Sequence, residues 1–260
     1  MTPDAYEAFT ESLRVRLEED PRVLGLVALG SMARQDYEPD RWSDHDFFVI
    51  TRSGEQEAFR GDRSWLPRSD RIVLSYRETP HGVKELYDDG HLVEFAVFDL
   101  EQLRLARVNR YRVLLDRADV GRRLADLAAG TAAGGEARAD DAWLLGQFLT
   151  ALLSGAARFA RGERMSGRLL VESHAMSPLL ILLTRHVPSG RRDLSDNLDP
   201  FRRFELVHPA LGRELDAILR RETPAAALGL LDLARRELGG RIPSFPTSAA
   251  EIVARRIEEI

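Results

Sequence analysis

Two short apolar runs, joined by a glycine turn and a polar loop, place the strongest constraint on how this chain folds. Residues 23–29 form the first run and residues 47–50 the second, and both are rich in β-forming side chains, which predicts two strands. The first run ends at Gly30-Ser31, a turn signal, and the second begins through the acidic segment 44–46. The pattern therefore predicts a phosphate-sized anion-binding site at the turn, beside two carboxylates on one face of the second strand.

Asp44 and Asp46 stand at the entrance of the second strand. Because side chains alternate between the faces of a strand, both project to the same side, about 7 Å apart along the chain. Carboxylates at this spacing repel each other unless a cation lies between them, and Mg²⁺ prefers such hard oxygen ligands. His45 points to the opposite face, where we expect it to pack behind the sheet.

The turn offers groups that bind phosphate. Gly30 has no side chain, so backbone N–H groups can approach a phosphate closely, and Ser31 adds a hydroxyl donor. We expect Arg34 to help open a helix whose N-terminus favours negative charge. Together with the acidic pair, this predicts metal-assisted chemistry on a nucleoside triphosphate. The alternative is a solvated strand entrance beside an ordinary turn.

The order of these motifs resembles the nucleotidyltransferase superfamily of the polymerase-beta type. The resemblance is carried by Gly30-Ser31, a gap of about a dozen residues, and Ser43-Asp44-His45-Asp46. Within the superfamily the chain is most similar to the aminoglycoside (streptomycin-type) adenylyltransferases. The resemblance is specific over residues 20–52, looser to about residue 120, and limited to a helical second domain beyond that.

The resemblance implies a reaction and its cofactors. Asp44 and Asp46 would hold Mg²⁺, with two ions expected, on ATP or another nucleoside triphosphate. Gly30, Ser31, Arg34 and Ser43 would contact the nucleotide. The expected reaction moves a nucleoside monophosphate to a hydroxyl of a small polar molecule, such as an aminoglycoside or lincosamide antibiotic.

The family pattern also requires a third carboxylate on a neighbouring strand, and Glu94 is the best candidate. It lies in the apolar segment 91–99, which follows a turn signal at residues 88–90. Strand alternation puts Glu94 on one face with apolar neighbours, and a buried acid is costly unless it binds a metal or a proton donor. By resemblance, Glu94 binds the second metal or acts as general base. The alternative is an edge-strand glutamate facing water.

A basic residue from the helical part usually reaches the phosphates in such families, most often a lysine. The only lysine of this chain is Lys84, in the first half, so an arginine must serve. The candidates are Arg158 and Arg161 at the end of one predicted helix and Arg168 at the start of the next, and the sequence does not choose among them. The alternative for each is a solvated helix face. Arg168 and His174 have a spacing that is catalytic in some helical nucleases, and we interpret it here as coincidence.

Composition narrows the class of protein. The 260 residues contain no cysteine, which excludes disulfides and thiolate metal sites, and a net charge of −5 argues against nucleic acid as the main partner. Abundant arginine, alanine and glycine indicate a GC-rich bacterial genome. We expect no signal peptide and no membrane span, and hence a cytoplasmic location.

The organisation predicted is an α+β protein with two domains. A nucleotidyltransferase catalytic domain, residues 1–127, would carry a mixed β-sheet flanked by helices, and a helical bundle, residues 138–260, would close over the nucleotide and acceptor, with residues 128–137 as linker. The elements expected in the first domain are a helix at 4–18, strands at 23–29, 47–50, 71–76, 92–98 and 112–116, the last at the sheet edge, and a short helix at 79–87. Helices are expected in the second domain at 140–161, 168–186 (kinked at Pro178), 200–205, 209–221, 224–238 and 248–259, the last opened by a capping box, Ser248 to Glu251.

Other functions remain open at this stage. The chain could be an antitoxin-like nucleotidyltransferase that modifies a partner protein, or a nucleotide-binding protein without catalysis. Nucleic-acid polymerisation is disfavoured by the acidic composition. The acceptor, the base preference and the oligomeric state are not encoded in any motif that we recognise.

Overall fold

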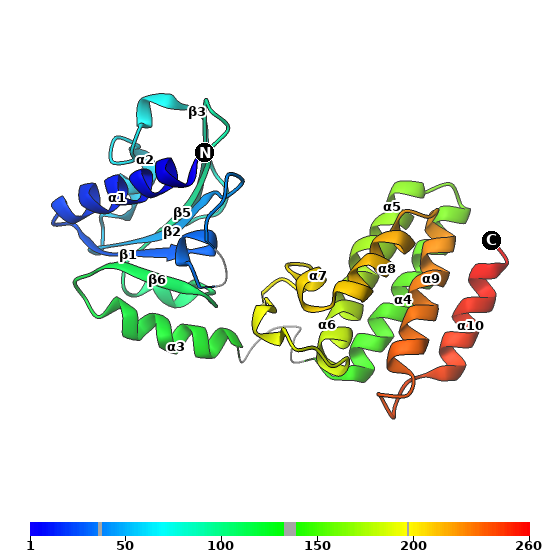
Figure 1. The fold of residues 1–260 in the computed structure, drawn as a ribbon. Coiled ribbons are helices and arrows are strands. Elements are labelled where there is room, and N and C mark those ends of the chain that lie inside the picture. The colour runs from blue at the N-terminus through cyan, green and yellow to red at the C-terminus, as the bar shows by residue number, and fades with distance from the viewer. Residues whose placement is uncertain (36–37, 133–138, 197) are drawn as a thin grey trace. The chain divides into compact units, whose positions relative to one another are not determined.

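The computed structural model describes residues 1–35, 38–132, 139–196 and 198–260. The chain forms two compact units, Met1–Ala133 and Gly134–Ile260 (Figure 1). The first unit combines a sheet with helices, and the described residues of the second are mostly helical. The chain is therefore an α+β protein, as the sequence predicted.

The N-terminal unit, called the sheet unit below, contains the predicted first helix and the predicted strands in the predicted order. It differs at residues 79–87, described below, and by helices at residues 56–61 and 120–132 that were not among the predicted elements. Its helix α1 begins at Pro3, where the side chain of Thr2 accepts a hydrogen bond from the Ala5 backbone N at 3.3 Å. Its elements are α1 (Pro3–Glu19), β1 (Val23–Leu29), η1 (Gly30–Ala33), β2 (His45–Thr51), α2 (Gln56–Gly61), η2 (Ser69–Arg71), β3 (Ile72–Arg77), β4 (Gly82–Tyr87), β5 (Leu92–Phe98), η3 (Gln102–Leu105), β6 (Tyr111–Asp116) and α3 (Val120–Ala132).

The topology of the sheet brings the predicted site together. Within the described residues the sheet has six strands in the order β3-β4-β5-β2-β1-β6, so β6 lies at the edge as expected. β1 and β2 are antiparallel, so the end of β1 lies beside the start of β2. β5 is parallel to β2, so its start lies at the same end of the sheet. The glycine turn, the acidic pair and the strand of Glu94 therefore converge.

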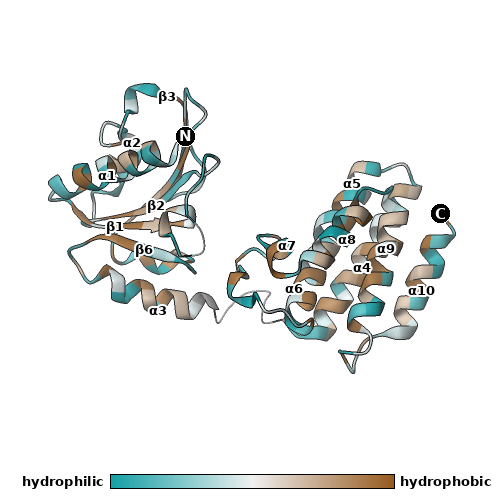
Figure 2. Cartoon of the chain, viewed as in Figure 1, coloured by the Kyte–Doolittle hydropathy of each residue, from teal (hydrophilic) through white to brown (hydrophobic). Residues whose placement is uncertain are grey.

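Both faces of the sheet are covered by apolar side chains. Phe47 and Val49 pack with the buried stripe of α1 on one face, while Ile50 packs with Val120 of α3 on the other. Figure 2 shows hydrophobic residues along β1 and β2. Because side chains alternate, Asp46 belongs to the face that α3 covers. The apolar stripe of α1 consists of Tyr6, Phe9, Leu13 and Leu17, which are all buried.

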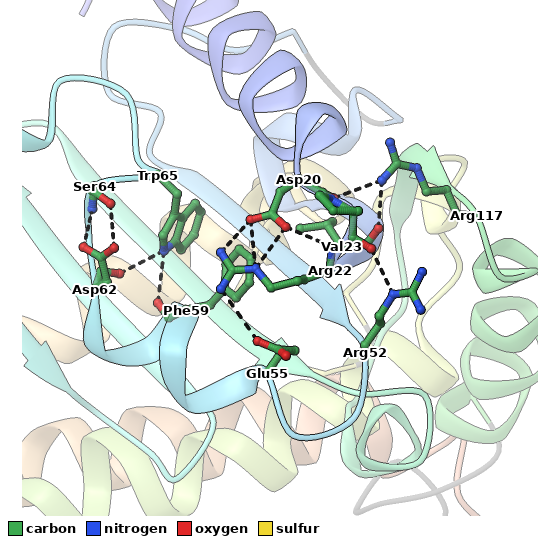
Figure 3. A network of polar contacts seen from close by, with 11 residues as sticks. Asp20, Arg22, Val23, Arg52, Glu55, Phe59, Asp62, Ser64, Trp65 and Arg117 are labelled. Carbon is green, nitrogen blue, oxygen red and sulfur yellow. Dashed lines mark hydrogen bonds and ion pairs between the residues drawn. The ribbon is translucent and has the colours of Figure 1, made fainter.

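A polar network closes the opposite end of these strands (Figure 3). Arg22 Nη2 donates to Asp20 Oδ2 at 2.7 Å, and Arg22 Nη1 lies 3.6 Å from Glu55 Oε2. Arg117 Nη1 donates to the backbone carbonyl of Val23 at 3.1 Å. These contacts join the end of α1, the start of β1, the segment before α2 and the end of β6. They fix the strand ends that lie away from the acidic pair.

The short helix predicted at residues 79–87 is wrong, because this segment contains strand β4. Thr79 and Gly82 form the turn of a β3–β4 hairpin, in which Gly82 N donates to Thr79 Oγ1 at 2.8 Å. Burial then alternates with period two, since Val83, Glu85 and Tyr87 are buried and the residues between them are half-buried. That period fits a strand and not a helix.

The C-terminal unit, called the helical unit below, has a core of leucines and small residues. Leu144, Phe148 and Leu152 of its first helix are among the fully buried side chains. None of the helices in the described part of the chain is long and apolar enough to span a membrane. The helical elements are α4 (Asp141–Ala160), α5 (Arg164–Leu169), η5, a π-helix (Leu170–Ala175), α6 (Met176–His186), η6 (Arg192–Leu194), α7 (Phe204–Val207), α8 (Pro209–Leu219), α9 (Thr223–Leu238) and α10 (Thr247–Glu258).

Several predicted helix boundaries in this unit change. The single helix expected at 168–186 is divided into α5, a π-helical segment and α6, with Pro178 near the start of α6, where its missing N–H cannot continue the ladder. α7 begins only at Phe204, and α10 begins at Thr247 without a side-chain cap, so the capping box does not form. Residues 128–132 of the predicted linker belong to α3, residues 133–137 and the start of the predicted second domain at residue 138 lie outside the described residues, and the domain roles stay a prediction.

Candidate active site

Three carboxylates meet where β2 and β5 begin. One oxygen from each of Asp44, Asp46 and Glu94 lies within 4.8 Å of the other two. All three residues are half-buried, so their oxygens face a surface that a ligand can reach. Two oxygens on opposite sides of a Mg²⁺ ion are about 4.2 Å apart, so small side-chain rotations would let the three share an ion. The donor set fits a hard divalent cation.

Strand pairing explains why these carboxylates meet. Asp46 is the direct partner of Glu94 in the parallel pairing of β2 and β5. Glu94 shares its strand face with Ala96 and Phe98, as the alternation predicted, but it is 31% exposed and not buried. The prediction that a third carboxylate lies near the acidic pair is therefore matched by the geometry, while its roles as metal ligand and base stay predictions.

Gly30 lies directly against the acidic pair. Its φ is +49°, a left-handed conformation that glycine adopts without the usual cost. A Cβ atom at this position would lie 2.6 Å from Asp46 Oδ2, closer than nonbonded atoms approach. The absence of a side chain at Gly30 is thus what allows the backbone turn to touch the carboxylate.

Ser31 is buried, and its hydroxyl holds the loop. Ser31 Oγ donates to the Asp44 carbonyl at 3.0 Å and lies 2.9 Å from the hydroxyl of Tyr6. Tyr6 in turn donates to the same Asp44 carbonyl at 2.8 Å. The sequence predicted only a helix at residues 4–18 around Tyr6, so the hydrogen bond that holds Asp44 is visible only in the tertiary structure.

The helix that Arg34 was expected to open is not present, which corrects that prediction. The 3₁₀ turn η1 begins at Gly30, and Arg34 ends it with φ +53°. The Arg34 guanidinium pairs with the carboxylate of Glu7 and lies 3.7 Å from Glu38 Oε2. Ser43 Oγ accepts a hydrogen bond from the Asp40 backbone N at 2.9 Å. Contact of Arg34 or Ser43 with a nucleotide stays a prediction.

Arg112 of β6 is a cation beside the turn that the sequence did not single out. Its Nη2 donates to the Met32 carbonyl in η1 at 3.1 Å. Partial burial, and then the neighbouring charge of Arg34, lower the pKa of Arg112 from its ordinary value. The guanidinium groups of Arg34 and Arg112 therefore both lie near the turn η1, whose backbone N–H groups are the predicted phosphate donors.

His45 packs behind the sheet, as expected. It is fully buried, stacks on the ring of Tyr6 at 3.8 Å between centroids, and its Nδ1 lies 2.8 Å from His91 Nε2. Burial, and then the proximity of His91, lower the pKa of His45 to about 3. Burial also lowers the pKa of His91 to about 4. Both imidazoles are therefore neutral at pH 7.

Lys84 stands next to the carboxylates, and the sequence analysis gave it no role. Its Nζ lies 3.0 Å from Glu94 Oε1 and 2.9 Å from Glu78 Oε1. The hydrogen bonds that the Lys84 ammonium donates to these carboxylates, first to Glu78 and then to Glu94, raise the pKa of Lys84 above its usual range. Lys84 is the only lysine in the sequence, and this could have marked it as a candidate site residue. The incorrect prediction of a helix at residues 79–87 placed Lys84 outside the sheet and away from Glu94.

Arg158 and Arg161 belong to the helical unit. Arg158 hydrogen-bonds the hydroxyl of Ser166, and Arg161 Nε donates to Glu163 Oε1 at 3.1 Å. Arg158 also lines a pocket of about 400 Å³ between α4 and the π-helical segment, together with Trp143 and His174. The contact of either arginine with phosphate stays a prediction.

No family model matches the sequence, and no curated protein matches it. An aminoglycoside 6-adenyltransferase from Bacillus subtilis aligns over 96% of this chain and 96% of its own, with 13% sequence identity and a TM-score of 0.39. The CD-NTase CdnG of Bradyrhizobium diazoefficiens, solved in complex with GTP, aligns over 100% of this chain and 86% of its own, with 12% identity and a TM-score of 0.28. At TM-scores below 0.5 these likenesses decide nothing about the chemistry of this chain, which depends on the side chains themselves.

Proposed function

We propose that this protein is a Mg²⁺-dependent nucleotidyltransferase that transfers a nucleoside monophosphate, in the first instance AMP from ATP, to a hydroxyl of a small polar molecule. The observation that carries the proposal is the set of oxygens from Asp44, Asp46 and Glu94 within 4.8 Å of one another. The close contact between the Gly30 turn and Asp46 supports the proposal. Backbone N–H groups in such a turn bind phosphate, and this turn lies beside one of the proposed metal ligands.

The residues divide the work of binding. Asp44 and Asp46 hold the metal, and the N–H groups of η1 face the terminal phosphates. Arg112 supplies positive charge beside that turn, since its guanidinium is already anchored on the Met32 carbonyl. When bound, Mg²⁺ would offset charge on the phosphate oxygens and orient the triphosphate. The chain itself contributes positioning and electrostatic stabilisation.

Glu94 is the proposed proton acceptor for the acceptor hydroxyl. The hydroxyl oxygen forms a bond to the α-phosphorus, the bond from that phosphorus to the bridging oxygen breaks, and pyrophosphate leaves. The hydroxyl proton passes to the Glu94 carboxylate, which must lie within hydrogen-bond reach of it. Aminoglycosides and lincosamides are the proposed acceptors, and a net charge of −5 suits a cationic one.

The test is pyrophosphate release from each of the four nucleoside triphosphates against a panel of aminoglycosides and lincosamides. Asp46→Asn is the loss-of-function variant, and Asp70→Asn, an exposed acid of η2, is the matched control. Release with one acceptor, lost in Asp46→Asn and kept in Asp70→Asn, supports the proposal. The proposal is contradicted if Asp44→Asn or Asp46→Asn keeps more than about a tenth of the wild-type rate. A tenfold loss of rate corresponds to a rise of roughly 1.4 kcal/mol in the activation free energy.

Calorimetry of Mg·ATP binding, together with a transfer assay, separates the two other functions from each other. A nucleotide-binding protein without catalysis binds Mg·ATP but releases no pyrophosphate with any acceptor. A nucleotidyltransferase that modifies a protein also binds Mg·ATP and is silent with the antibiotics, but it transfers radiolabel from α-labelled ATP to a protein acceptor.

A further inference from the structure

The sole lysine of the chain lies beside the three carboxylates. Lysine and arginine together number 37, and Lys84 is the only lysine, so 36 of the 37 are arginine. A composition so biased toward arginine makes a lysine at this position a specific feature. Lys84 is also 22% exposed, so much of its side chain is covered by the surrounding structure.

Strand pairing aligns Lys84 with two of the carboxylates. Lys84 is the direct partner of Glu94 between β4 and β5, and Glu94 is the direct partner of Asp46 between β5 and β2. The three residues therefore form one row across three adjacent strands. We call Lys84, Glu94 and Asp46 the charged row. Its order is one positive charge followed by two negative charges.

The row contains a repulsion that the lysine offsets. Directly paired like charges on neighbouring strands destabilise a sheet, and Asp46 and Glu94 are such a pair. The Lys84 ammonium touches Glu94 Oε1 at 3.0 Å and is held from the other side by Glu78 at 2.9 Å. An ammonium is a compact charge with three rotatable donors and can bond two separate carboxylates, whereas a guanidinium favours one carboxylate in a planar fork.

We propose that Lys84 is a positioning residue that serves as the internal counter-cation of the carboxylate site and holds Glu94 beside Asp46. The inference rests on the proposed function for its catalytic meaning, since it assigns Lys84 to the carboxylates of that same site. Its physical content is independent of any activity: Lys84 offsets the repulsion between Glu94 and Asp46.

The test is thermal unfolding without metal. The full chain carries Trp143→Phe, so that the remaining tryptophans, Trp42 and Trp65, both report on the sheet unit. Lys84→Met is expected to lower the unfolding midpoint by about 3 °C or more. Adding Asp46→Asn is expected to restore at least half of that loss, because it removes the other charge of the repelling pair. Lys84→Arg, which keeps the charge, is expected to lower the midpoint less than Lys84→Met does.

The recovery separates an electrostatic role from a merely structural one. Arg71→Met is the matched control, because Arg71 lies in the same unit and pairs with a carboxylate, Asp88, at 2.6 Å. Asp46→Asn is expected to stabilise Arg71→Met less than it stabilises Lys84→Met, because Arg71 does not contact the charged row. If Asp46→Asn fails to stabilise Lys84→Met, or stabilises Arg71→Met equally, the proposal is overturned.

Failure of the proposed function would be seen in a different experiment. Absence of a Mg²⁺-induced rise in the wild-type midpoint, with no pyrophosphate release, would remove the metal chemistry. It would leave the result of the Lys84 and Asp46 variants unchanged, since those measurements contain no metal.

Discussion

A Cβ atom at Gly30 would lie 2.6 Å from Oδ2 of Asp46, so the turn after β1 and the acidic strand entrance touch through backbone and carboxylate. The turn of the predicted phosphate site therefore contacts a predicted metal ligand directly. A side chain at position 30 would displace the Asp46 carboxylate, so a change in the turn also changes the predicted metal site.

Gly30→Ala is therefore expected to lower turnover at least tenfold, which corresponds to a rise of roughly 1.4 kcal/mol in the activation free energy. The matched control is Gly54→Ala, since Gly54 also has a positive φ, +89°, but a Cβ there meets nothing within 4 Å. Both variants carry the backbone cost of a left-handed alanine, about 1–2 kcal/mol of stability. Steady-state pyrophosphate release should fall only in Gly30→Ala. Thermal midpoints should fall in both variants, and further in Gly30→Ala, whose Cβ also meets Asp46. Comparable turnover in the two variants would show that the contact is unimportant.

Tyr6→Phe is expected to lower turnover several-fold, because the Tyr6 hydroxyl donates to the Asp44 carbonyl at 2.8 Å and helps to position that residue. Tyr87→Phe is the control, since the equally buried Tyr87 donates to the Pro67 carbonyl at 2.9 Å, away from the site. Tyr87→Phe loses one hydrogen bond, about 1 kcal/mol of stability, and Tyr6→Phe also loses the contact with Ser31 Oγ at 2.9 Å. Urea unfolding should show a loss in both variants, no smaller in Tyr6→Phe, and kinetics should separate the two. A Tyr87→Phe enzyme as slow as Tyr6→Phe would refute a positioning role.

Stability is expected to fall below pH 6.5. His45 and His91 titrate at about 3 and about 4 in the folded protein because burial disfavours their charged forms, against an ordinary value of 6.5. The unfolded chain therefore binds more protons, and the stability present above pH 6.5 is lost as the pH falls toward the folded pKa values. The expected loss between pH 7 and pH 5 is up to about 2 kcal/mol for each histidine.

Urea titrations of the metal-free protein at pH 7 and pH 5 measure this loss. His91→Phe should reduce the difference between the two pH values, whatever its own baseline stability. His174→Gln, an exposed histidine of the helical unit, should leave the difference as it is in the wild type. Equal pH dependence in wild type and His91→Phe would contradict the assignment.

Glu85→Ala is expected to destabilise the sheet unit by about 3 kcal/mol, because it removes one partner of a buried ion pair. Glu85 is fully buried and binds the guanidinium of Arg63, and it accepts a hydrogen bond from Ser75 Oγ at 2.9 Å. Glu101→Ala is the contrasting control, since Glu101 is 78% exposed and its ion pair with the exposed Arg104 should contribute less than about 1 kcal/mol. Chemical unfolding measures both, and equal losses would be inconsistent with this explanation.

The helical pattern assigned to residues 79–87 shows where local reasoning fails. The segment mixes charged and apolar residues that suit either period, and its true state depends on pairing with β3 and β5. That error also hid Lys84, since a lysine on a helix has no register with Glu94. The π-helical segment before Pro178 and the missing cap of α10 depend likewise on packing.

Local patterns in the sequence predicted the strands at the site, the turn at Gly30, the same-face geometry of Asp44 and Asp46 and the position of His45 behind the sheet. These follow from periodicity and turn chemistry, which act between residues a few positions apart, whereas Glu94 was selected because the family resemblance implies a third carboxylate. The pairing of Asp46 with Glu94, the pairing of Glu94 with Lys84 and the hydrogen bond from Tyr6 to Asp44 are visible only in the folded protein. Strand register and contacts between helix and sheet join segments that are distant in sequence, and no local pattern specifies which of many compatible pairings buries the most apolar surface.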